Sequence, residues 1–379
     1  MVKKRIIFFS TNSIWGGSEV LWTEAAVKMK DLGYNISAVA GYGFQNVQPF
    51  IDRQESFFCV ADRFEPLPVL KLAINKTGIG KFEPTDCLHE FLLDKSPCLA
   101  IISMGNNAEG MDYMQLCVKN KIPFITIVHL VVVSKWPMMN DERIDQARLL
   151  FDQSLMNCFV SKQIKSMHEQ FLGYSGTNSK IVYNPFIKKG NQSVNYPPLI
   201  EGQYKVALLG RIENYHKGYD LLIDVLAQKK WKDRNIVFDI YGDGPHQNIL
   251  KRLIALHGIN NLNVKDYVES VAEVWQTHHM LLMPSRLEGQ SLTLIEAMNF
   301  KRTCVVTNVG GVEELIEEGK SGFIAAYPAS ASIDNALERA WEKRDDWEQM
   351  GIDAYCSIKS NHPADATGYF LEQIIPLIK

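Results

Sequence analysis

The stretch YKVALLGRIENYHKG, residues 204–218, sets the fold expectation for this chain of 379 residues. Its first part, YKVALLG, is a continuous apolar run, which is typical of a strand buried on both faces of a parallel sheet. A polar segment follows directly, and the helical pattern YDLLIDVLAQ begins at Tyr219. A buried strand, a turn and a helix in this order predict one β/α unit of a doubly wound domain.

Similar apolar runs recur along the chain and fall into two sets, separated within each set by helical patterns. They lie at residues 5–11, 35–42, 99–104 and 123–130, and then at 204–210, 236–242, 279–285 and 302–308. A polar, proline-containing stretch at 188–203 lies between the two sets, as a linker would. We therefore expect an α/β protein with an N-terminal domain over 1–190, a C-terminal domain over 191–364 and a final helix over 365–379.

Composition and charge are those of a folded protein. Apolar residues make up 46% of the chain, charged residues 22%, and the formal net charge is -3 at pH 7. A chain without a basic domain argues against a nucleic-acid partner. The seven cysteines contain no C-x-x-C pair, which argues for a reducing compartment and against a zinc site.

We expect the protein in the cytoplasm. The most apolar window, residues 124–133, is shorter than the roughly 20 residues that a membrane-spanning helix needs. The beginning of the chain lacks the long apolar run and the cleavage site of a signal peptide. Basic residues at 229–234 leave a peripheral contact with the membrane surface open, although most such runs are solvated faces.

Two cations follow the strand at 204–210. Arg211 comes directly after it and Lys217 six residues later, before Gly218. Ligands of doubly wound domains gather beyond the carboxyl ends of strands, where an Arg fork and a Lys charge would suit a diphosphate. The alternative is that both are surface residues without a shared partner, and spacing alone does not decide between the two.

The stretch SRLEGQSLTLIEAM, residues 285–298, places two acids around a turn. A helix that begins near Ser291 would present free backbone N–H groups to an anion. Glu288 lies in the loop before that helix and Glu296 lies one turn into it. The pattern fits a nucleoside diphosphate whose ribose is held by one Glu, or simply a polar loop followed by a solvent-facing Glu.

Two features of the first domain also occupy strand ends. Gly16 and Gly17 form a strand-to-helix turn, which would contact an anion or sugar or would only be a tight turn. His129 ends an apolar strand, where it is either a cleft-edge residue or a satisfied core residue. His278 and His279 have no acidic or cysteine partner at ligand spacing, so we expect them to be structural.

Four motifs occur together in the order known from one family. They are GGSE at 16–19, GRIENYHKG at 210–218, YGDGP at 241–245, and EGQSLTLIEAM at 288–298 followed by TNVGGVEELIEEGKSGFI. The chain resembles the retaining, nucleotide-sugar-dependent glycosyltransferases of family 4. The resemblance covers nearly the whole second domain and less of the first. It implies the GT-B fold, in which a Rossmann-like acceptor domain and a Rossmann-like donor domain face a cleft and the terminal helix packs back on the first domain.

The resemblance implies a role for each donor-binding group. Arg211 and Lys217 would grip the diphosphate, with help from the backbone N–H groups of Leu292 and Thr293. Glu296 would hold the ribose. These positive groups would make a metal ion unnecessary, and no carboxylate pair of the D-x-D type is present.

The remaining implied roles concern the sugar and the base. Glu288 and His129 would lie against the transferred sugar, and Gly17 would approach the phosphate or the acceptor. The base would lie near Val268. Gln290 and Ser291 replace a commoner Phe and Gly of the family, so they affect the loop around the donor sugar.

The implied reaction moves a sugar from a UDP-, GDP- or ADP-sugar to an acceptor hydroxyl with retention of configuration. The acceptor would be a saccharide or a lipid-linked saccharide at the inner face of the membrane, in polysaccharide or glycolipid synthesis. No organic or metal cofactor is expected. The alternatives are a GT-B epimerase or hydrolase of nucleotide sugars, and a nucleotide-sugar-binding protein without turnover.

Overall fold

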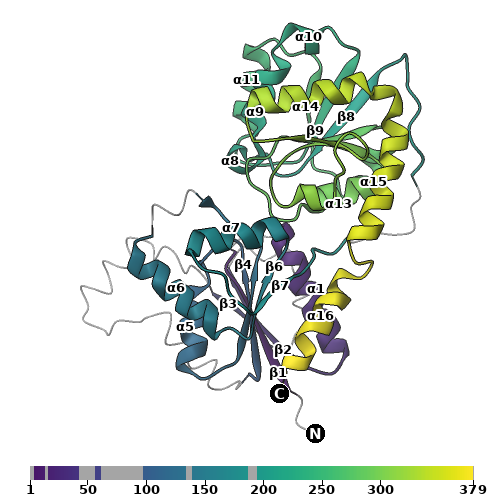
Figure 1. The fold of residues 1–379 in the computed structure, drawn as a ribbon. Coiled ribbons are helices and arrows are strands. Elements are labelled where there is room, and N and C mark those ends of the chain that lie inside the picture. The colour runs from purple at the N-terminus through teal and green to yellow at the C-terminus, as the bar shows by residue number, and fades with distance from the viewer. Residues whose placement is uncertain are drawn as a thin grey trace. The chain divides into compact units, whose positions relative to one another are not determined.

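The computed structural model describes residues 4–12, 16–41, 56–60, 97–133, 139–186 and 194–378 (Figure 1). The chain divides into two compact units. Unit 1 comprises Met1–Asn184 and Asp365–Lys379, and unit 2 comprises Pro185–Ala364. The expected border at 190/191 lies outside the described residues, and the division falls before it. The segment from Asp365 onward joins unit 1 although it follows unit 2 in sequence.

Unit 1 contains, within the described residues, a sheet of seven parallel strands in the order β3-β2-β1-β4-β5-β6-β7. The strands are β1 (Arg5–Ser10), β2 (Asn35–Gly41), β3 (Ser56–Val60), β4 (Leu99–Met104), β5 (Phe124–Val128), β6 (Met156–Phe159) and β7 (Ser179–Ile181). The helices are α1 (Gly17–Asp31), α5 (Met111–Lys119), α6 (Asp141–Gln153), α7 (Lys162–Leu172) and α16 (Ala366–Ile374), with a short 3-10 turn η5 (Ile375–Leu377). The strand order reverses at β1 and β4, as in a doubly wound sheet.

The terminal helix α16 packs on α1 (Figure 1). The Thr367 hydroxyl donates to the Glu24 carboxylate at 2.7 Å. Lys28 forms an ion pair of 2.6 Å with Asp365, whose side chain also accepts from the Gly368 N–H and so caps α16. The pairing of a first helix with a last one makes unit 1 a discontinuous domain.

Unit 2 contains, in its described part, a sheet of six parallel strands in the order β10-β9-β8-β11-β12-β13. The strands are β8 (Tyr204–Leu209), β9 (Ile236–Tyr241), β10 (Leu262–Lys265), β11 (Met280–Met283), β12 (Thr303–Thr307) and β13 (Phe323–Ala325). The α-helices are α8 (Asn214–Lys217), α9 (Tyr219–Leu226), α10 (Lys229–Lys232), α11 (Gln247–Leu256), α12 (Val271–Trp275), α13 (Leu292–Asn299), α14 (Ser330–Glu342) and α15 (Trp347–Asn361). The 3-10 helices are η3 (Val312–Glu314) and η4 (Arg344–Asp346).

Both faces of the unit 2 sheet are buried, which explains its continuous apolar runs. Along β8, Val206 and Leu208 join a core with residues of α9 and α14, whereas Ala207 joins a second core with residues of α13 and α15. Successive side chains of a strand point to opposite faces, so a strand covered on both faces needs an apolar residue at nearly every position. The two expected doubly wound units are thus both present.

Arg302 is a buried cation that ties several segments of unit 2 together. Its side chain has no exposed surface. The guanidinium donates to a set of backbone carbonyls, those of Asn195, Trp275, His278, Phe300 and Lys301. It also lies over the Tyr196 ring, 5.2 Å from its centre, and burial lowers the pKa of the guanidinium to about 10. Because buried carbonyls need donors, this one side chain satisfies several loops at once.

We predict that Arg302→Met lowers the free energy of unfolding of unit 2 by about 3 kcal/mol or more, because the carbonyls lose their donor inside the protein. The shift of the urea midpoint measures this loss. Arg252→Met, at an exposed position on α11, is the matched control. A loss below about 1 kcal/mol for Arg302→Met, which is the usual range of surface substitutions, would contradict this account.

Candidate functional site

The strand order of unit 2 reverses between β8 and β11, which are neighbours in the sheet. The loop with Arg211 leaves the carboxyl end of β8, and the loop with Glu288 leaves the carboxyl end of β11. Carboxyl ends of parallel strands meet at one edge of a sheet, and such a switch point is where ligands of doubly wound domains bind. The topology therefore brings the two loops together.

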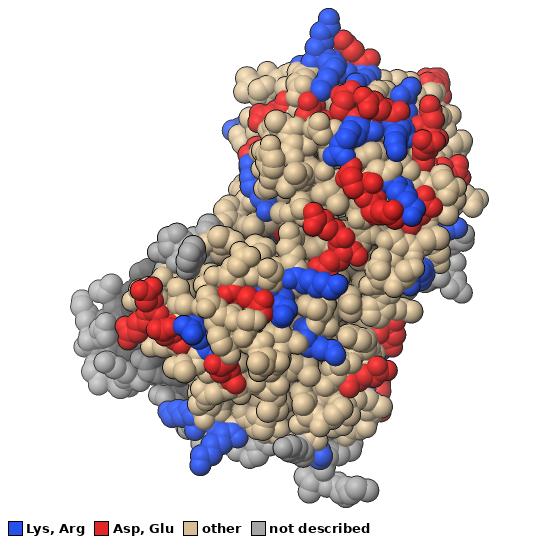
Figure 2. Space-filling view, in the orientation of Figure 1, with Lys and Arg blue, Asp and Glu red and all other residues tan. Residues whose placement is uncertain are grey.

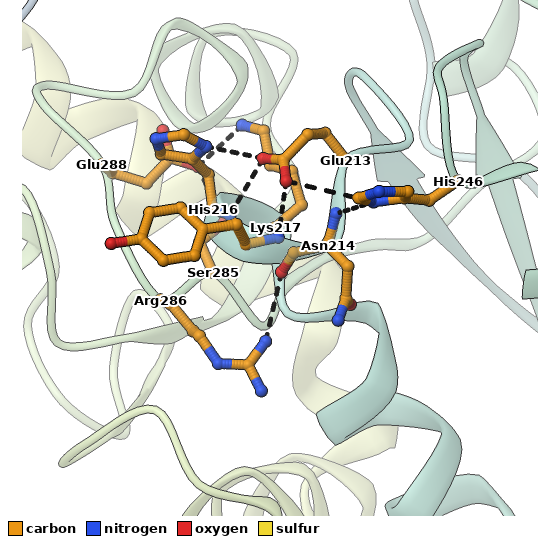
Figure 3. Close-up of polar contacts among 9 residues, drawn as sticks. Glu213, Asn214, His216, Lys217, His246, Ser285, Arg286 and Glu288 are labelled. Carbon is orange, nitrogen blue, oxygen red and sulfur yellow. Dashed lines mark hydrogen bonds and ion pairs between the residues drawn. The ribbon is translucent and has the colours of Figure 1, made fainter.

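Glu213 organises the first loop by capping α8 (Figure 3). Its carboxylate accepts from the N–H groups of Tyr215 at 2.7 Å and His216 at 3.0 Å. The ring Nδ1 of His216 lies 2.6 Å from the same carboxylate. Burial alone would raise the pKa of Glu213, but these hydrogen bonds outweigh it and lower the pKa. The charged carboxylate therefore fixes the turn that ends at Lys217.

Lys217 and Glu288 form an ion pair between the two loops. The ammonium Nζ lies 2.7 Å from Oε1 of the carboxylate, and the Ser285 hydroxyl donates to the same oxygen at 2.7 Å (Figure 3). The two charged side chains are 22% and 12% exposed. The structure therefore brings together two residues that the sequence placed in separate motifs, and leaves both within reach of solvent.

A glycine allows the two loops to touch through their backbones. Gly218 has a φ of 64°, in the left-handed region. A Cβ at this position would lie 2.2 Å from the carbonyl oxygen of Pro284. A larger residue would therefore both strain the turn and push the loops apart.

The helix α13 begins with a side-chain cap. The Ser291 Oγ accepts from the Leu294 N–H at 3.5 Å and donates to the Met283 sulfur at 3.3 Å. Both contacts direct the hydroxyl into unit 2. Leu292 and Thr293 occupy the first two helical positions, where N–H groups have no carbonyl of their own helix to bind.

The other expected donor-site residues of unit 2 have different surroundings. Arg211 is exposed and Glu296 is half-buried on α13. Gln290 is 7% exposed. Val268 lies in the loop after β10 and packs partly on the core that α13 and α15 cover. These residues share the carboxyl-end side of the sheet or the helix that follows it, and their contacts with a ligand stay predictions.

His129 lies directly after β5 in unit 1 and is 3% exposed. Its Nε2 is 3.1 Å from the Ser103 hydroxyl on the neighbouring strand β4. Its Nδ1 has no hydrogen-bond partner among the described residues. Burial lowers the pKa of the imidazole to about 3, so the ring is neutral at physiological pH.

The turn with Gly16 and Gly17 is held by Glu19. Gly16 caps α1 in an extended conformation, and both glycines are exposed. The Glu19 carboxylate is completely buried. It accepts from the side chains of Ser10, Asn12, Ser18 and Trp22, at 2.5 to 3.2 Å. The acid of the GGSE motif therefore stabilises the shape of the turn.

The two histidines expected to be structural are buried in unit 2. His278 Nε2 lies 3.1 Å from the Asp239 carboxylate and its Nδ1 lies 2.9 Å from the Val274 carbonyl. His279 Nδ1 accepts from the Lys205 N–H at 3.0 Å. These contacts agree with the structural role expected for both.

Comparison with known proteins finds similarity in the region that contains Lys217 and Glu288. Residues 195–355 match the family model "Glycosyl transferases group 1". Alpha-D-kanosaminyltransferase of Streptomyces kanamyceticus is 28% identical over 152 residues, which are 39% of each chain. N-acetyl-alpha-D-glucosaminyl L-malate synthase of Bacillus anthracis is 24% identical over 85% of this chain and 84% of its own. This chain thus spans about two fifths of the first relative's length.

The solved structure of Anabaena HepE in complex with UDP matches with a TM-score of 0.75 and 15% identity, over 98% of this chain and 100% of its own. Sucrose-phosphate synthase of Thermosynechococcus elongatus matches with a TM-score of 0.74 and 13% identity, over 99% of each chain. The fold is GT-B. The expected fold class is confirmed, with two Rossmann-like units.

Sequence reasoning missed three residues that organise these loops of unit 2. Ser285 contacts Glu288, while Arg286 and Asp220 bind each other across the two loops. Ser285 and Arg286 stand inside the quoted stretch, but no spacing rule relates Arg286 to Asp220, which lies 66 positions earlier. Proximity to Glu288 in sequence was the one available signal.

We predict that His129 makes unit 1 sensitive to acid. Its imidazole titrates near 6.5 in an unfolded chain and near 3 in the folded one, so between these values the unfolded chain binds more protons. The contribution of His129 to the free energy of unfolding is therefore complete above pH 6.5. It falls as the pH falls, by on the order of 3 kcal/mol at pH 4.

Urea unfolding of the wild type and of His129→Gln between pH 7 and pH 4 measures this dependence. The variant loses less stability on acidification than the wild type. His257→Gln, at an exposed histidine, is the matched control. If the free energy of unfolding fell equally with pH in the wild type and in His129→Gln, a buried neutral imidazole would be ruled out.

Proposed function

We propose that this protein is a retaining glycosyltransferase that moves a sugar from a nucleoside diphosphate sugar to an acceptor hydroxyl. One observation carries the proposal. Lys217 and Glu288 meet at 2.7 Å at the strand-order reversal of unit 2, inside the region that matches the glycosyltransferase family model. A cation beside a carboxylate suits a ligand that joins a phosphate to a polyhydroxyl group.

The donor diphosphate binds Arg211 and Lys217 in this proposal. The N–H groups of Leu292 and Thr293, at the positive end of α13, add hydrogen bonds to the phosphate oxygens. The Glu296 carboxylate accepts from the ribose hydroxyls, and the base lies near Val268. Solved neighbours in complex with UDP and with UDP-glucose support a nucleotide sugar as the ligand.

In the transfer step, the bond between the anomeric carbon and the diphosphate oxygen breaks and a bond to the acceptor oxygen forms on the same face. The leaving diphosphate takes the acceptor proton. Arg211 and Lys217 stabilise the charge that develops on this diphosphate, which is electrostatic catalysis. Glu288 lies against the transferred sugar. The neutral imidazole of His129, in unit 1, lies near the sugar and the reacting oxygen.

A resident metal is unnecessary in this mechanism, because protein cations and a helix terminus supply the positive charge. Among the described residues, no group of three or more His, Cys, Asp or Glu side chains could hold a metal ion. We propose UDP-, GDP- or ADP-sugars as donors. The structure of Gln290 and of the loop around it then affects which sugar fits.

The proposed acceptor is a saccharide or a lipid-linked saccharide, in polysaccharide or glycolipid synthesis. Support comes from relatives such as poly(ribitol-phosphate) alpha-N-acetylglucosaminyltransferase of Staphylococcus aureus, 31% identical over 28% of this chain and 22% of its own. Contact with the inner face of the membrane, from the cytoplasm, belongs to the same proposal. None of the helices in the described ranges is long and apolar enough to cross a membrane.

Two of the four cations in the basic cluster at 229–234 form ion pairs with acids of unit 2. Lys230 pairs with Asp334 at 2.8 Å, and Arg234 pairs with Glu338. On the face drawn in Figure 2, basic and acidic side chains are interspersed over unit 2. These ion pairs reduce the charge that Lys230 and Arg234 could offer to a membrane surface.

We predict that the wild-type protein releases free nucleoside diphosphate from one of the UDP-, GDP- or ADP-sugars, and that a panel of mono- and disaccharide acceptors accelerates the release. Lys217→Ala and Glu288→Ala reduce kcat/KM by about 100-fold or more, because each removes a group that stabilises the transition state. Both variants keep a cooperative thermal transition, so a lost rate is not a lost fold.

Lys251→Ala, at an exposed lysine of α11, is the matched control and keeps wild-type rates. Absence of nucleotide release from every donor would refute the transferase. A donor sugar that changes configuration, or that is hydrolysed at an acceptor-independent rate, would indicate an epimerase or a hydrolase. Binding of a nucleotide sugar without any turnover would indicate a binding protein.

We also predict opposite effects of two substitutions at the cap of α13. Ser291→Ala removes the cap and lowers stability by about 1 kcal/mol. Ser291→Asp keeps a cap and favours the helix dipole, but its charge repels a diphosphate at the helix terminus. Ser291→Asp should therefore bind UDP, GDP or ADP more weakly than Ser291→Ala by calorimetry. The reverse ranking in binding would contradict an anion site at α13.

A further inference from the structure

Arg286 forms a second connection between the loops that carry Lys217 and Glu288. Its guanidinium binds the Asp220 carboxylate through two hydrogen bonds, each of 2.6 Å. The same group donates to the Asn214 carbonyl at 3.1 Å (Figure 3). One side chain from the loop after β11 thus holds the beginning of α8 and the first turn of α9.

Backbone contacts reinforce this connection at the other end of α8. The N–H groups of Arg286 and Leu287 both donate to the His216 carbonyl, at 2.6 and 3.2 Å. The Asn214 side chain in turn accepts from the Asp220 N–H at 2.9 Å. The turn before Lys217 is therefore bound to the Glu288 loop at both of its ends.

The Arg286 contacts differ from the Lys217–Glu288 pair in what they would do when a donor binds. A diphosphate would compete for the Lys217 ammonium and a sugar for the Glu288 carboxylate, so that pair exchanges partners. The Arg286 guanidinium binds both carboxylate oxygens of Asp220 and the Asn214 main-chain carbonyl. In the proposed site, none of these groups exchanges its partner for a donor group. Its planar fork matches a carboxylate in a geometry that a Lys cannot reproduce.

We propose that Arg286 and Asp220 form a latch that positions Lys217 and Glu288 for the donor diphosphate and sugar, and that stays closed while the Lys217–Glu288 pair opens. Arg286 is then a positioning residue, because it acts through the two loops and contacts no substrate. This inference rests on the function proposed above. Preorganised loops avoid ordering costs at the moment of binding, which is why the latch affects affinity.

The first test examines the latch in the ligand-free protein by hydrogen–deuterium exchange. Arg286→Lys and Asp220→Asn should each increase exchange in peptides that cover residues 211–218, although Arg286 lies on the other loop. Stable hydrogen bonding across the loops protects these amides, and loss of the fork removes that protection. Unchanged exchange in both variants would overturn the latch, whatever the protein binds.

The second test measures binding of UDP, GDP and ADP by calorimetry. Each single substitution should lower the affinity for the nucleoside diphosphate that the wild type binds by roughly tenfold. The double variant Arg286→Lys with Asp220→Asn should lose little more than either single variant, because both break one interaction. Losses of affinity that add fully in the double variant would overturn the positioning role. Unchanged nucleotide affinity in variants with increased hydrogen–deuterium exchange would overturn it as well.

Arg234→Lys is the matched control, since Arg234 forms a comparable forked pair with Glu338 elsewhere in unit 2. This control should lower the thermal midpoint to a similar extent while UDP, GDP or ADP affinity stays at the wild-type value. An equal loss of affinity in the control would show a general stability effect and refute the latch. A wild-type protein that binds none of the three nucleotides would refute the proposed function, and with it the positioning role, even where exchange confirms the connection.

Discussion

The adjacency of β8 and β11 in the sheet is the constraint on which the proposed site depends. Lys217 and Glu288 are 71 positions apart in sequence, yet their charged atoms lie 2.7 Å apart. The parallel pairing of the two strands places their carboxyl ends at one edge, and the strand order reverses at that point. Chains leaving a switch point diverge to opposite faces of the sheet and leave room for a ligand between their loops. The groups proposed to bind the diphosphate and the ribose, Arg211, Lys217 and Glu296, are attached to the first of those loops or to the helix that follows the second.

Arg302 and Lys217 of unit 2 have contrasting surroundings. Arg302 is fully buried and its donors are occupied by main-chain carbonyls, so it stabilises the fold and is closed to ligands. Lys217 is partly exposed and bound to one carboxylate oxygen. In the proposal, an incoming phosphate takes over this ammonium while the donor sugar takes over the Glu288 carboxylate. Arg286 combines features of both, because its guanidinium is occupied by protein acceptors although its side chain is partly exposed.

The sequence predicted eight of the strands and missed β3, β6, β7, β10 and β13, most of which lie at sheet edges. The runs at 5–11, 99–104, 204–210 and 302–308 correspond to β1, β4, β8 and β12. In contrast, β7 and β13 have three residues each, and β10 has four. They lie at sheet edges, where one neighbour is missing and a continuous apolar run is not required. The site shows a similar limit, since motifs identified Lys217 and Glu288 but the Arg286–Asp220 pair follows only from tertiary structure.

Two buried ionisable groups of unit 1 differ in how fully the described residues satisfy their polar atoms. The Glu19 carboxylate is surrounded by donors from four side chains, so although burial raises its pKa, its oxygens are satisfied by the fold. His129 is buried to a similar degree, but its Nδ1 has no partner in the described part of the chain. An unpaired buried polar atom costs about 1–3 kcal/mol, and native structures keep few of them. A hydrogen-bond donor that reached this nitrogen would recover that free energy.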